Sequence, residues 1–82
     1  MPGDEMKTIG FDWKSIGNNI HQLRISNDYS ISELSKIINV SSRSIKSWEK
    51  GLSAPSLKNI INLSNLFLIK IDDLLCYSLE VK

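Results

Sequence analysis

The sequence predicts an all-α fold, with five short helices in one small domain. Apolar residues recur at spacings of three and four along most of the chain, and no stretch alternates apolar and polar residues long enough to form a strand. Serine or aspartate precedes four of the five apolar segments, where helix N-caps are expected. A chain of 82 residues suits a single core, which a few helices can supply.

We expect the domain to span residues 11–77, between a flexible N-terminal tail at 1–10 and a C-terminal tail at 78–82. The first ten residues contain proline, two glycines and mixed charges, and they lack the apolar segment of a signal peptide. No apolar run approaches the ~20 residues of a membrane span. Cys76, the one cysteine, cannot form an internal disulfide. The expected location is therefore a reducing prokaryotic cytoplasm or nucleoid.

The first two helices have recognisable ends. The first is expected to begin after Asp12 as its N-cap and to end at residues 27–28, Asn-Asp, which tolerate the left-handed backbone. Ser30 and Glu33 have the spacing of a capping box and open the second helix. Residues 39–41 break that helix after about two turns.

Three further helices follow. The third is expected to run from Ser41 or Ser42 to Lys50, with Gly51 ending it. After a loop over residues 52–55, Ser56 is expected to cap the fourth helix. A short fifth helix begins at residues 72–73, Asp-Asp, which suit the positive end of its dipole.

The predicted third helix has two unlike faces at 100° per residue. One arc, expected to be buried, gathers Ser41, Ile45, Trp48, Glu49 and Leu52. The opposite arc carries three cations and no carboxylate: Arg43, Lys46, Ser47 and Lys50. Such an arc suits DNA, because cations neutralise phosphates and small side chains permit a close approach. An ordinary solvated surface is the alternative.

Glu49 lies at the edge of the buried arc, where an unpaired carboxylate is costly. Arg24 lies on the same edge of the first helix as Ile20 and Leu23. We therefore predict a structural ion pair between Arg24 and Glu49 that joins the first helix to the third; a solvated glutamate is the alternative. His21, on the polar side of the first helix, is expected to be solvated.

A short helix, a three-residue turn and a basic helix form the geometry that presents the second helix of the pair to the major groove. In this order the segments resemble the Cro- and lambda-repressor-like helix-turn-helix domains, the XRE family. The resemblance covers residues 16–75 and rests on IGNNIHQLR, YSISELSKIINVSSRSIKSWEKG, PSLKNIINLSNLF and IDDLL. It implies a compact five-helix lambda-repressor-like DNA-binding domain.

The resemblance also implies the residues that touch DNA. Base contacts are expected from Ser42, Arg43, Lys46 and Ser47. Phosphate contacts are expected from backbone amides at two places, the start of the second helix (Ser30 and Ile31) and the loop after the third helix (Leu52 and Ser53). Ser41, Lys50 and Lys58 are the other residues expected to contact phosphates. The family's frequent Arg-to-Glu pair falls on Arg24 and Glu49, in agreement with the helical arcs.

Four positions depart from the family pattern. Ser35 replaces the usual alanine and Asn39 the usual turn glycine, and both are acceptable because they are small or tolerate the left-handed backbone. Ile31 stands where a glutamine often contacts the DNA backbone, which removes a polar contact but leaves the amide. Leu68 stands where a glycine commonly ends the fourth helix. Because a left-handed leucine costs roughly 1–2 kcal/mol, we expect this helix to end differently.

The C-terminal part of the chain is denser in apolar residues than a small core requires. We expect a dimer surface formed by Phe67, Leu68, Ile69 and Leu75. A two-fold homodimer places two recognition helices roughly 34 Å apart, so the expected partner is double-stranded DNA carrying an inverted-repeat operator.

The predicted function is a sequence-specific DNA-binding transcriptional regulator, a dimeric repressor, rather than an enzyme. One histidine and no nucleophile elbow offer no catalytic triad, and no cysteine or histidine cluster has the spacing of metal ligands. We expect no cofactor and, without a ligand-binding domain in this sequence, no small-molecule ligand. Two alternatives stay open. One is an antitoxin-type regulator with a toxin as protein partner. The other is a protein-interaction module that has lost DNA binding, an alternative that Ile31 and a net charge of +1 leave open.

Overall fold

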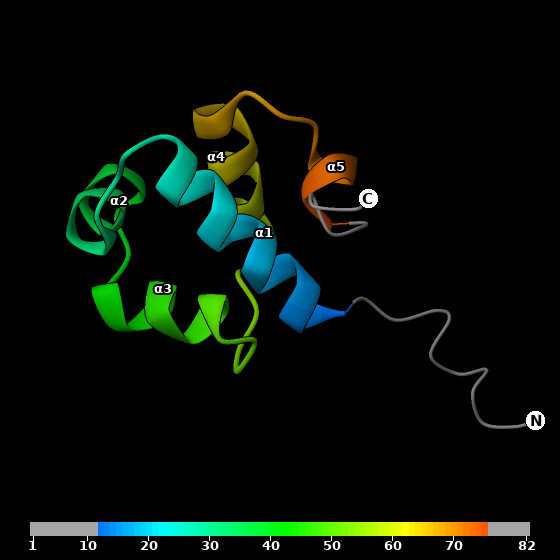
Figure 1. The fold of residues 1–82 in the computed structure, drawn as a ribbon, viewed down its shortest axis with the longest axis horizontal. Helices are drawn as coiled ribbons and strands as arrows, with labels where there is room; N and C mark the ends of the chain where they lie inside the picture. Colours follow the sequence, from blue (N-terminus) through cyan, green and yellow to red (C-terminus); the bar gives the residue numbers. More distant parts are fainter. Residues whose placement is uncertain (1–11, 76–82) are drawn as a thin grey trace, which may run out of the picture.

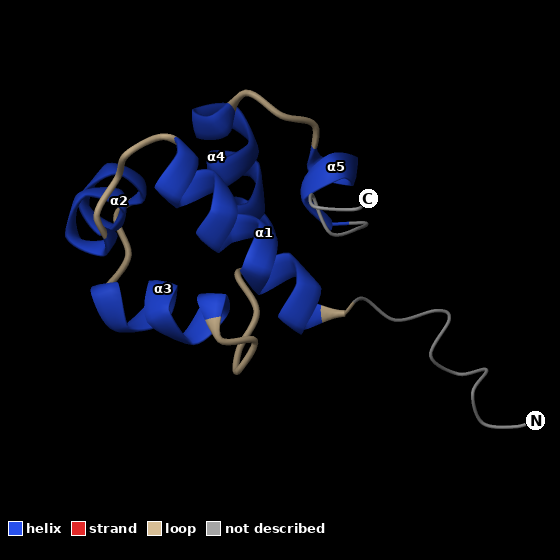
Figure 2. Ribbon diagram, in the orientation of Figure 1, coloured by secondary structure: helices blue, strands red, loops and turns tan. Residues whose placement is uncertain are grey.

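The computed structural model describes residues 12–75, which fold into five helices (Figures 1 and 2). They are α1 (Trp13–Ser26), α2 (Ile31–Ile38), α3 (Ser42–Glu49), α4 (Leu57–Phe67) and α5 (Ile71–Leu75). This part of the chain contains no strand, so the predicted all-α class is confirmed. None of its helices is long and apolar enough to cross a bilayer. The predicted tails at 1–10 and 78–82, and Cys76, lie outside the described residues.

The first four helices begin directly after their predicted caps, whereas α5 begins at Ile71, just before the expected residues 72–73. Asp12 Oδ1 accepts hydrogen bonds from the amides of Lys14 at 3.1 Å and Ser15 at 3.3 Å. The capping box is complete, with the Glu33 amide 2.9 Å from Ser30 Oγ and the Ser30 amide 2.8 Å from Glu33 Oε1. Such a cap stabilises a helix by typically ~1 kcal/mol. Local side-chain chemistry therefore sets the helix starts.

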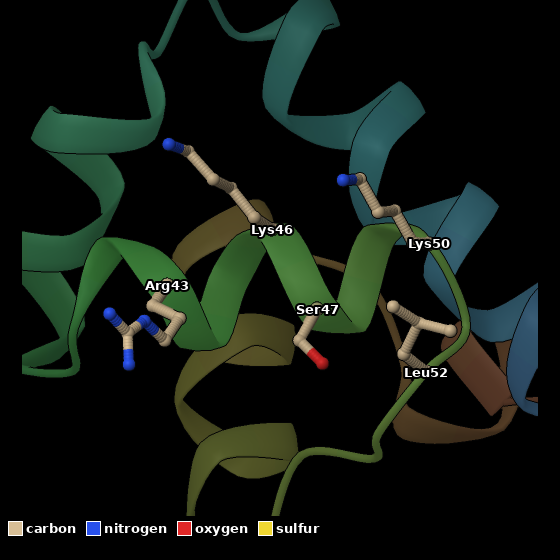
Figure 3. Close-up of a pocket in the computed structure, with 5 residues that line it drawn as sticks. All are labelled: Arg43, Lys46, Ser47, Lys50 and Leu52. Atoms are coloured by element: carbon tan, nitrogen blue, oxygen red, sulfur yellow. The ribbon is translucent and has the colours of Figure 1, made fainter.

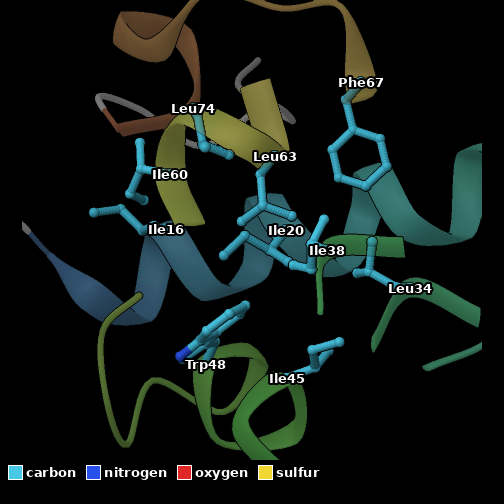
Figure 4. Close-up of a cluster of buried hydrophobic side chains, with 10 residues drawn as sticks. All are labelled: Ile16, Ile20, Leu34, Ile38, Ile45, Trp48, Ile60, Leu63, Phe67 and Leu74. Carbon is cyan, nitrogen blue, oxygen red and sulfur yellow. The ribbon is translucent and has the colours of Figure 1, made fainter. Parts of the chain in front are cut away.

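The core draws side chains from all five helices (Figure 4). Figure 1 shows α1 across the middle of the molecule, with α3 on one side and α4 and α5 on the other. The buried apolar side chains are Ile16, Ile20, Leu34, Ile38, Ile45, Trp48, Ile60, Leu63, Phe67 and Leu74. To this core α3 contributes only Ile45 and Trp48, and its Arg43 and Lys46 side chains stay exposed.

Two residues of α1 that carry no local signal of their partners, Asn19 and Gly17, determine how the helices pack. Asn19 is fully buried, and its Nδ2 donates to the Leu74 carbonyl at 3.0 Å, which ties α1 to α5. Gly17 lies against the last turn of α3, where a Cβ atom would come within 2.0 Å of the Trp48 carbonyl oxygen. Only glycine allows the two helices to approach so closely.

The end of α4 corrects two expectations. Leu68 does adopt the left-handed conformation, with φ 58° and ψ 43°, and its amide donates to the Ser64 carbonyl. The Leu68 side chain is 88% exposed, so little packing offsets the strain that this conformation creates between the Cβ atom and the residue's own backbone. Phe67 was expected on a dimer surface, but it is 7% exposed and its ring packs 6.3 Å from that of Tyr29. It belongs to the core.

Candidate nucleic-acid interface

The two helices α2 and α3 are joined by the predicted three-residue turn. Asn39 caps α2 in the left-handed conformation, with φ 58° and ψ 54°, and the Val40 amide donates to the Ser35 carbonyl at 3.0 Å. The Ser35 hydroxyl donates to the Ser32 carbonyl at 2.7 Å. The Ser42 hydroxyl lies 3.4 Å from that of Ser35. A small residue at position 35 thus allows α3 to start close against α2.

The inner face of α3 holds the helix to the domain. Ile45 and Trp48 are buried, and α3 packs mainly against α1 and α2. Leu52 was expected on this face, but it is 75% exposed. The helical arc does not extend to Leu52, because α3 ends at Glu49 and Gly51 turns the backbone with φ 74°.

Glu49 is the only carboxylate of α3, and it points to α1. Arg24 Nε lies 2.7 Å from Glu49 Oε2, and Arg24 Nη2 lies 3.1 Å from Oε1, so the pair is bidentate. Arg24 Nη1 also donates to the Tyr29 carbonyl at 2.9 Å. His21 Nδ1 lies 2.9 Å from Glu49 Oε1. The His21 side chain is 43% exposed, in line with a solvated residue, but it also has a carboxylate neighbour that comes from a distant part of the chain.

The electrostatics of this cluster favour the ionised pair. Burial raises the pKa of the Glu49 carboxyl, but hydrogen bonds and charge from Arg24 and His21 outweigh it, so the pKa lies below its ordinary value. The hydrogen bond to Glu49 raises the pKa of Arg24. The one negative charge of α3 is therefore neutralised on the inner side of the helix.

The outer face of α3 carries the predicted cations. Arg43, Lys46 and Lys50 are exposed, and together with Ser47 and Leu52 they line an open hollow, the outer hollow (Figure 3). Figure 3 shows Lys46 and Lys50 on one side of the helix and Arg43 and Ser47 on the other. No acidic residue lines the outer hollow. Its electrostatic character is positive, which suits an anionic partner.

Ser42, which is also expected to contact DNA bases, is half-buried, and its hydroxyl points to Ser35. A hydroxyl that donates one hydrogen bond still has lone pairs for an outside donor. Ser41 serves as the N-cap of α3, with its Oγ 3.0 Å from the Ser44 amide. Both serines therefore have structural roles at the start of α3.

The loop after α3 is fixed by backbone and side-chain hydrogen bonds. The Gly51 amide donates to the Trp48 carbonyl at 2.9 Å, and the Leu52 amide donates to the Ser47 carbonyl at 2.9 Å. The Ser53 and Ser47 hydroxyls lie 2.7 Å apart. The Leu52 amide was expected to hold a phosphate, but it is used within the chain.

The other expected phosphate residues lie on separate elements. Ser30 and Ile31 stand at the start of α2, where the Ser30 hydroxyl accepts from Glu33 and the half-buried Ile31 packs against the core. Lys58 is exposed in the first turn of α4. These three residues do not line the outer hollow, so a partner that touches them must extend beyond α3.

A metal site finds no support in the described part of the chain. Residues 12–75 contain no group of three or more histidine, cysteine, aspartate or glutamate side chains placed to hold a metal ion. The interface is built from cations, hydroxyls and one leucine.

Comparison with known proteins agrees with this geometry. A family model described as Helix-turn-helix matches residues 20–74. The comparison with curated proteins gives no match. Among solved structures, the chain is similar to the restriction-modification controller protein C.AhdI from Aeromonas hydrophila, with a TM-score of 0.70 and 24% identity. That match covers 77% of this chain and 96% of the controller protein.

Two further structures show the same arrangement of helices. One is a SinR protein/SinI protein complex, with a TM-score of 0.67, 30% identity and coverage of 72% of this chain and 58% of that one. The other is a transcriptional regulator from Listeria innocua, with a TM-score of 0.71, 24% identity and coverage of 82% and 63%. The fold of residues 12–75 is thus shared with regulators.

Proposed function

Because the chain belongs to the XRE-type helix-turn-helix family, we propose that it is a dimeric repressor that reads an operator by inserting α3 into the major groove. The family makes it a DNA-binding transcriptional regulator rather than an enzyme.

One observation carries the proposal: the second helix of the helix-turn-helix exposes Arg43, Lys46 and Lys50, while its only carboxylate is turned inward and paired. With a net charge of +1 for the whole chain, affinity for DNA must come from this local concentration of cations. Neutralised phosphates release counterions, so binding should weaken as salt rises.

The two sides of the outer face suggest separate roles. Arg43 has a guanidinium that can bind guanine O6 and N7 in a bidentate way, and Ser47 on the same side has a hydroxyl suited to a neighbouring base. Lys46 on the other side reaches a base or a phosphate, and Lys50 with it reaches phosphates. Arg43 is therefore the residue expected to contribute most to the choice of sequence.

Further contacts position the domain on the duplex. The hydroxyl of Ser53 and the ammonium of Lys58 are exposed, and the first amide of α2, at Ile31, is available for a phosphate at the positive end of the helix dipole. These contacts carry no sequence information, but they fix the register of α3 in the groove.

A homodimer accounts for the apolar side chains at the C-terminal end of the described residues. Leu68 is almost fully exposed, and Ile69 and Leu75 are half-buried, whereas Phe67 no longer belongs to this surface. In a two-fold symmetric dimer, the weakly basic outer faces of both domains bind the same DNA duplex together.

Selection of bound sites from random-sequence duplex DNA tests the proposal. We expect enriched sites to contain two inverted half-sites with centres roughly 34 Å, or one helical turn, apart. Enrichment of single half-sites by a protein that stays monomeric at high concentration would refute the dimer. Recovery of no enriched sequence would refute sequence-specific reading.

A further inference from the structure

Leu52 is a large apolar side chain on an otherwise polar surface. It is 75% exposed, and the other residues that line the outer hollow are Arg43, Lys46, Ser47 and Lys50. Exposed leucines are common and by themselves indicate nothing. The position of Leu52, among the residues proposed to read and bind DNA, is what gives it a chemical meaning.

The backbone holds Leu52 in place. Its amide donates to the Ser47 carbonyl at 2.9 Å, the preceding Gly51 amide donates to the Trp48 carbonyl, and the following Ser53 hydroxyl lies 2.7 Å from Ser47 Oγ. Leu52 is thus attached to the end of α3 rather than to a free loop. A side chain carried on a fixed backbone loses less conformational freedom on contact with a partner.

The chemistry of the major groove indicates what Leu52 can recognise. Base edges there present hydrogen-bond donors, acceptors and one apolar group, the 5-methyl of thymine. The cations and Ser47 match phosphates and polar base edges, whereas an isobutyl side chain matches only the methyl. We propose that Leu52 is a specificity-determining residue that contacts the 5-methyl group of a thymine in each half-site. This inference rests on the proposed function.

The experiment removes that methyl group alone. The probe is the highest-affinity duplex recovered from random-sequence selection with the wild-type protein, and each thymine is replaced in turn by deoxyuridine. Sugar and phosphate contacts do not distinguish the two bases. The proteins compared are wild type, Leu52→Ala and Leu57→Ala; Leu57 is 71% exposed but does not line the outer hollow, so it is the matched control.

We expect one thymine per half-site at which deoxyuridine weakens binding by the wild type and by Leu57→Ala about fourfold, which corresponds to ~0.8 kcal/mol for one buried CH2-sized group. Leu52→Ala should bind the thymine and deoxyuridine duplexes equally. Thermal unfolding should show all three proteins folded, since both leucines are exposed.

Three results overturn the inference while leaving the proposed function intact. They are a selected site without thymine, a wild type indifferent to deoxyuridine at every position, and a deoxyuridine penalty as large in Leu52→Ala as in the wild type. A wild type that selects no sequence at all removes the proposed function and this inference together.

Discussion

Arg24 Nε lies 2.7 Å from Glu49 Oε2, and this contact joins α1 to the last turn of α3. Both side chains are buried, with 9% and 10% of their surface exposed. The pair thus orients α3 from within the domain and removes a negative charge from the face proposed to meet DNA. A single ion pair serves both the packing and the electrostatics of the interface.

Replacing one partner of the Arg24–Glu49 pair should lower the stability of the domain. Arg24→Met leaves the Glu49 carboxylate buried without its main partner, and we expect the free energy of unfolding to fall by about 3 kcal/mol. The double variant Arg24→Met/Glu49→Leu should recover most of that loss, because no buried charge remains. Urea unfolding measures both. Lys36→Met, at an exposed position of α2, is the control, and an Arg24 effect no larger than the control contradicts the structural role.

The same pair should make stability depend on pH. The pKa of Glu49 is lowered from its ordinary value of 4.5, so the folded state binds fewer protons than the unfolded state at mildly acidic pH. The stabilisation is complete above about pH 4.5 and is lost as the pH falls through the lower, folded-state pKa. We expect the difference in unfolding free energy between wild type and Glu49→Gln to shrink over that range. A difference that stays constant down to about pH 3 argues against the lowered pKa.

Gly17 should tolerate no side chain. The Cβ atom of an alanine there would lie 2.0 Å from the Trp48 carbonyl oxygen, so α3 must move away from α1. We expect Gly17→Ala to destabilise the domain by about 2 kcal/mol, although alanine is the better helix former. Gln22→Ala, on the exposed side of α1, should be neutral or slightly stabilising. Chemical denaturation measures the free energy of unfolding of the two variants. A Gly17→Ala variant more stable than the wild type would show that α1 and α3 do not approach so closely.

Replacement of Leu68 by glycine should stabilise the domain. Its backbone is left-handed, with φ 58°, and its side chain is 88% exposed, so Leu68→Gly removes strain and little burial. We expect a net gain of about 1 kcal/mol in the free energy of unfolding. Leu57→Gly places glycine at an exposed leucine with helical backbone and should cost about 1 kcal/mol instead. Melting curves that shift in the same direction for both variants would contradict this account.

Most of the fold could be predicted from the sequence because its signals are local. A cap such as Ser30 acts on an amide three residues away, and the period of apolar residues defines the buried side of each helix. Arg24 and Glu49 could also be paired, since each lies at the edge of a buried arc. Such reasoning works where the residues of each helix define its own buried arc, and a charge at the edge of one arc then requires a partner at the edge of another.

The features of the fold and of the site that could not be predicted depend mostly on contacts between segments far apart in the sequence. His21 has its carboxylate neighbour 28 residues away, and the acceptor of Asn19 lies 55 residues away, so neither partner could be read from adjacent sequence. A glycine inside a helix such as Gly17 indicates a close approach, but the sequence does not say which segment approaches it. Leu52 was misplaced because its helical arc was extended past the end of α3.

The central claim is that the outer face of α3 reads DNA, and titration of the selected duplex over a salt series tests it most directly. We expect wild-type affinity to fall linearly with salt on logarithmic axes, and Lys46→Ala to reduce that slope by about one if it meets a phosphate. Arg43→Ala should cost about 1–3 kcal/mol on the selected duplex and much less on an unrelated one. Negligible affinity for every duplex at low salt, or wild-type binding by both variants, would contradict the claim.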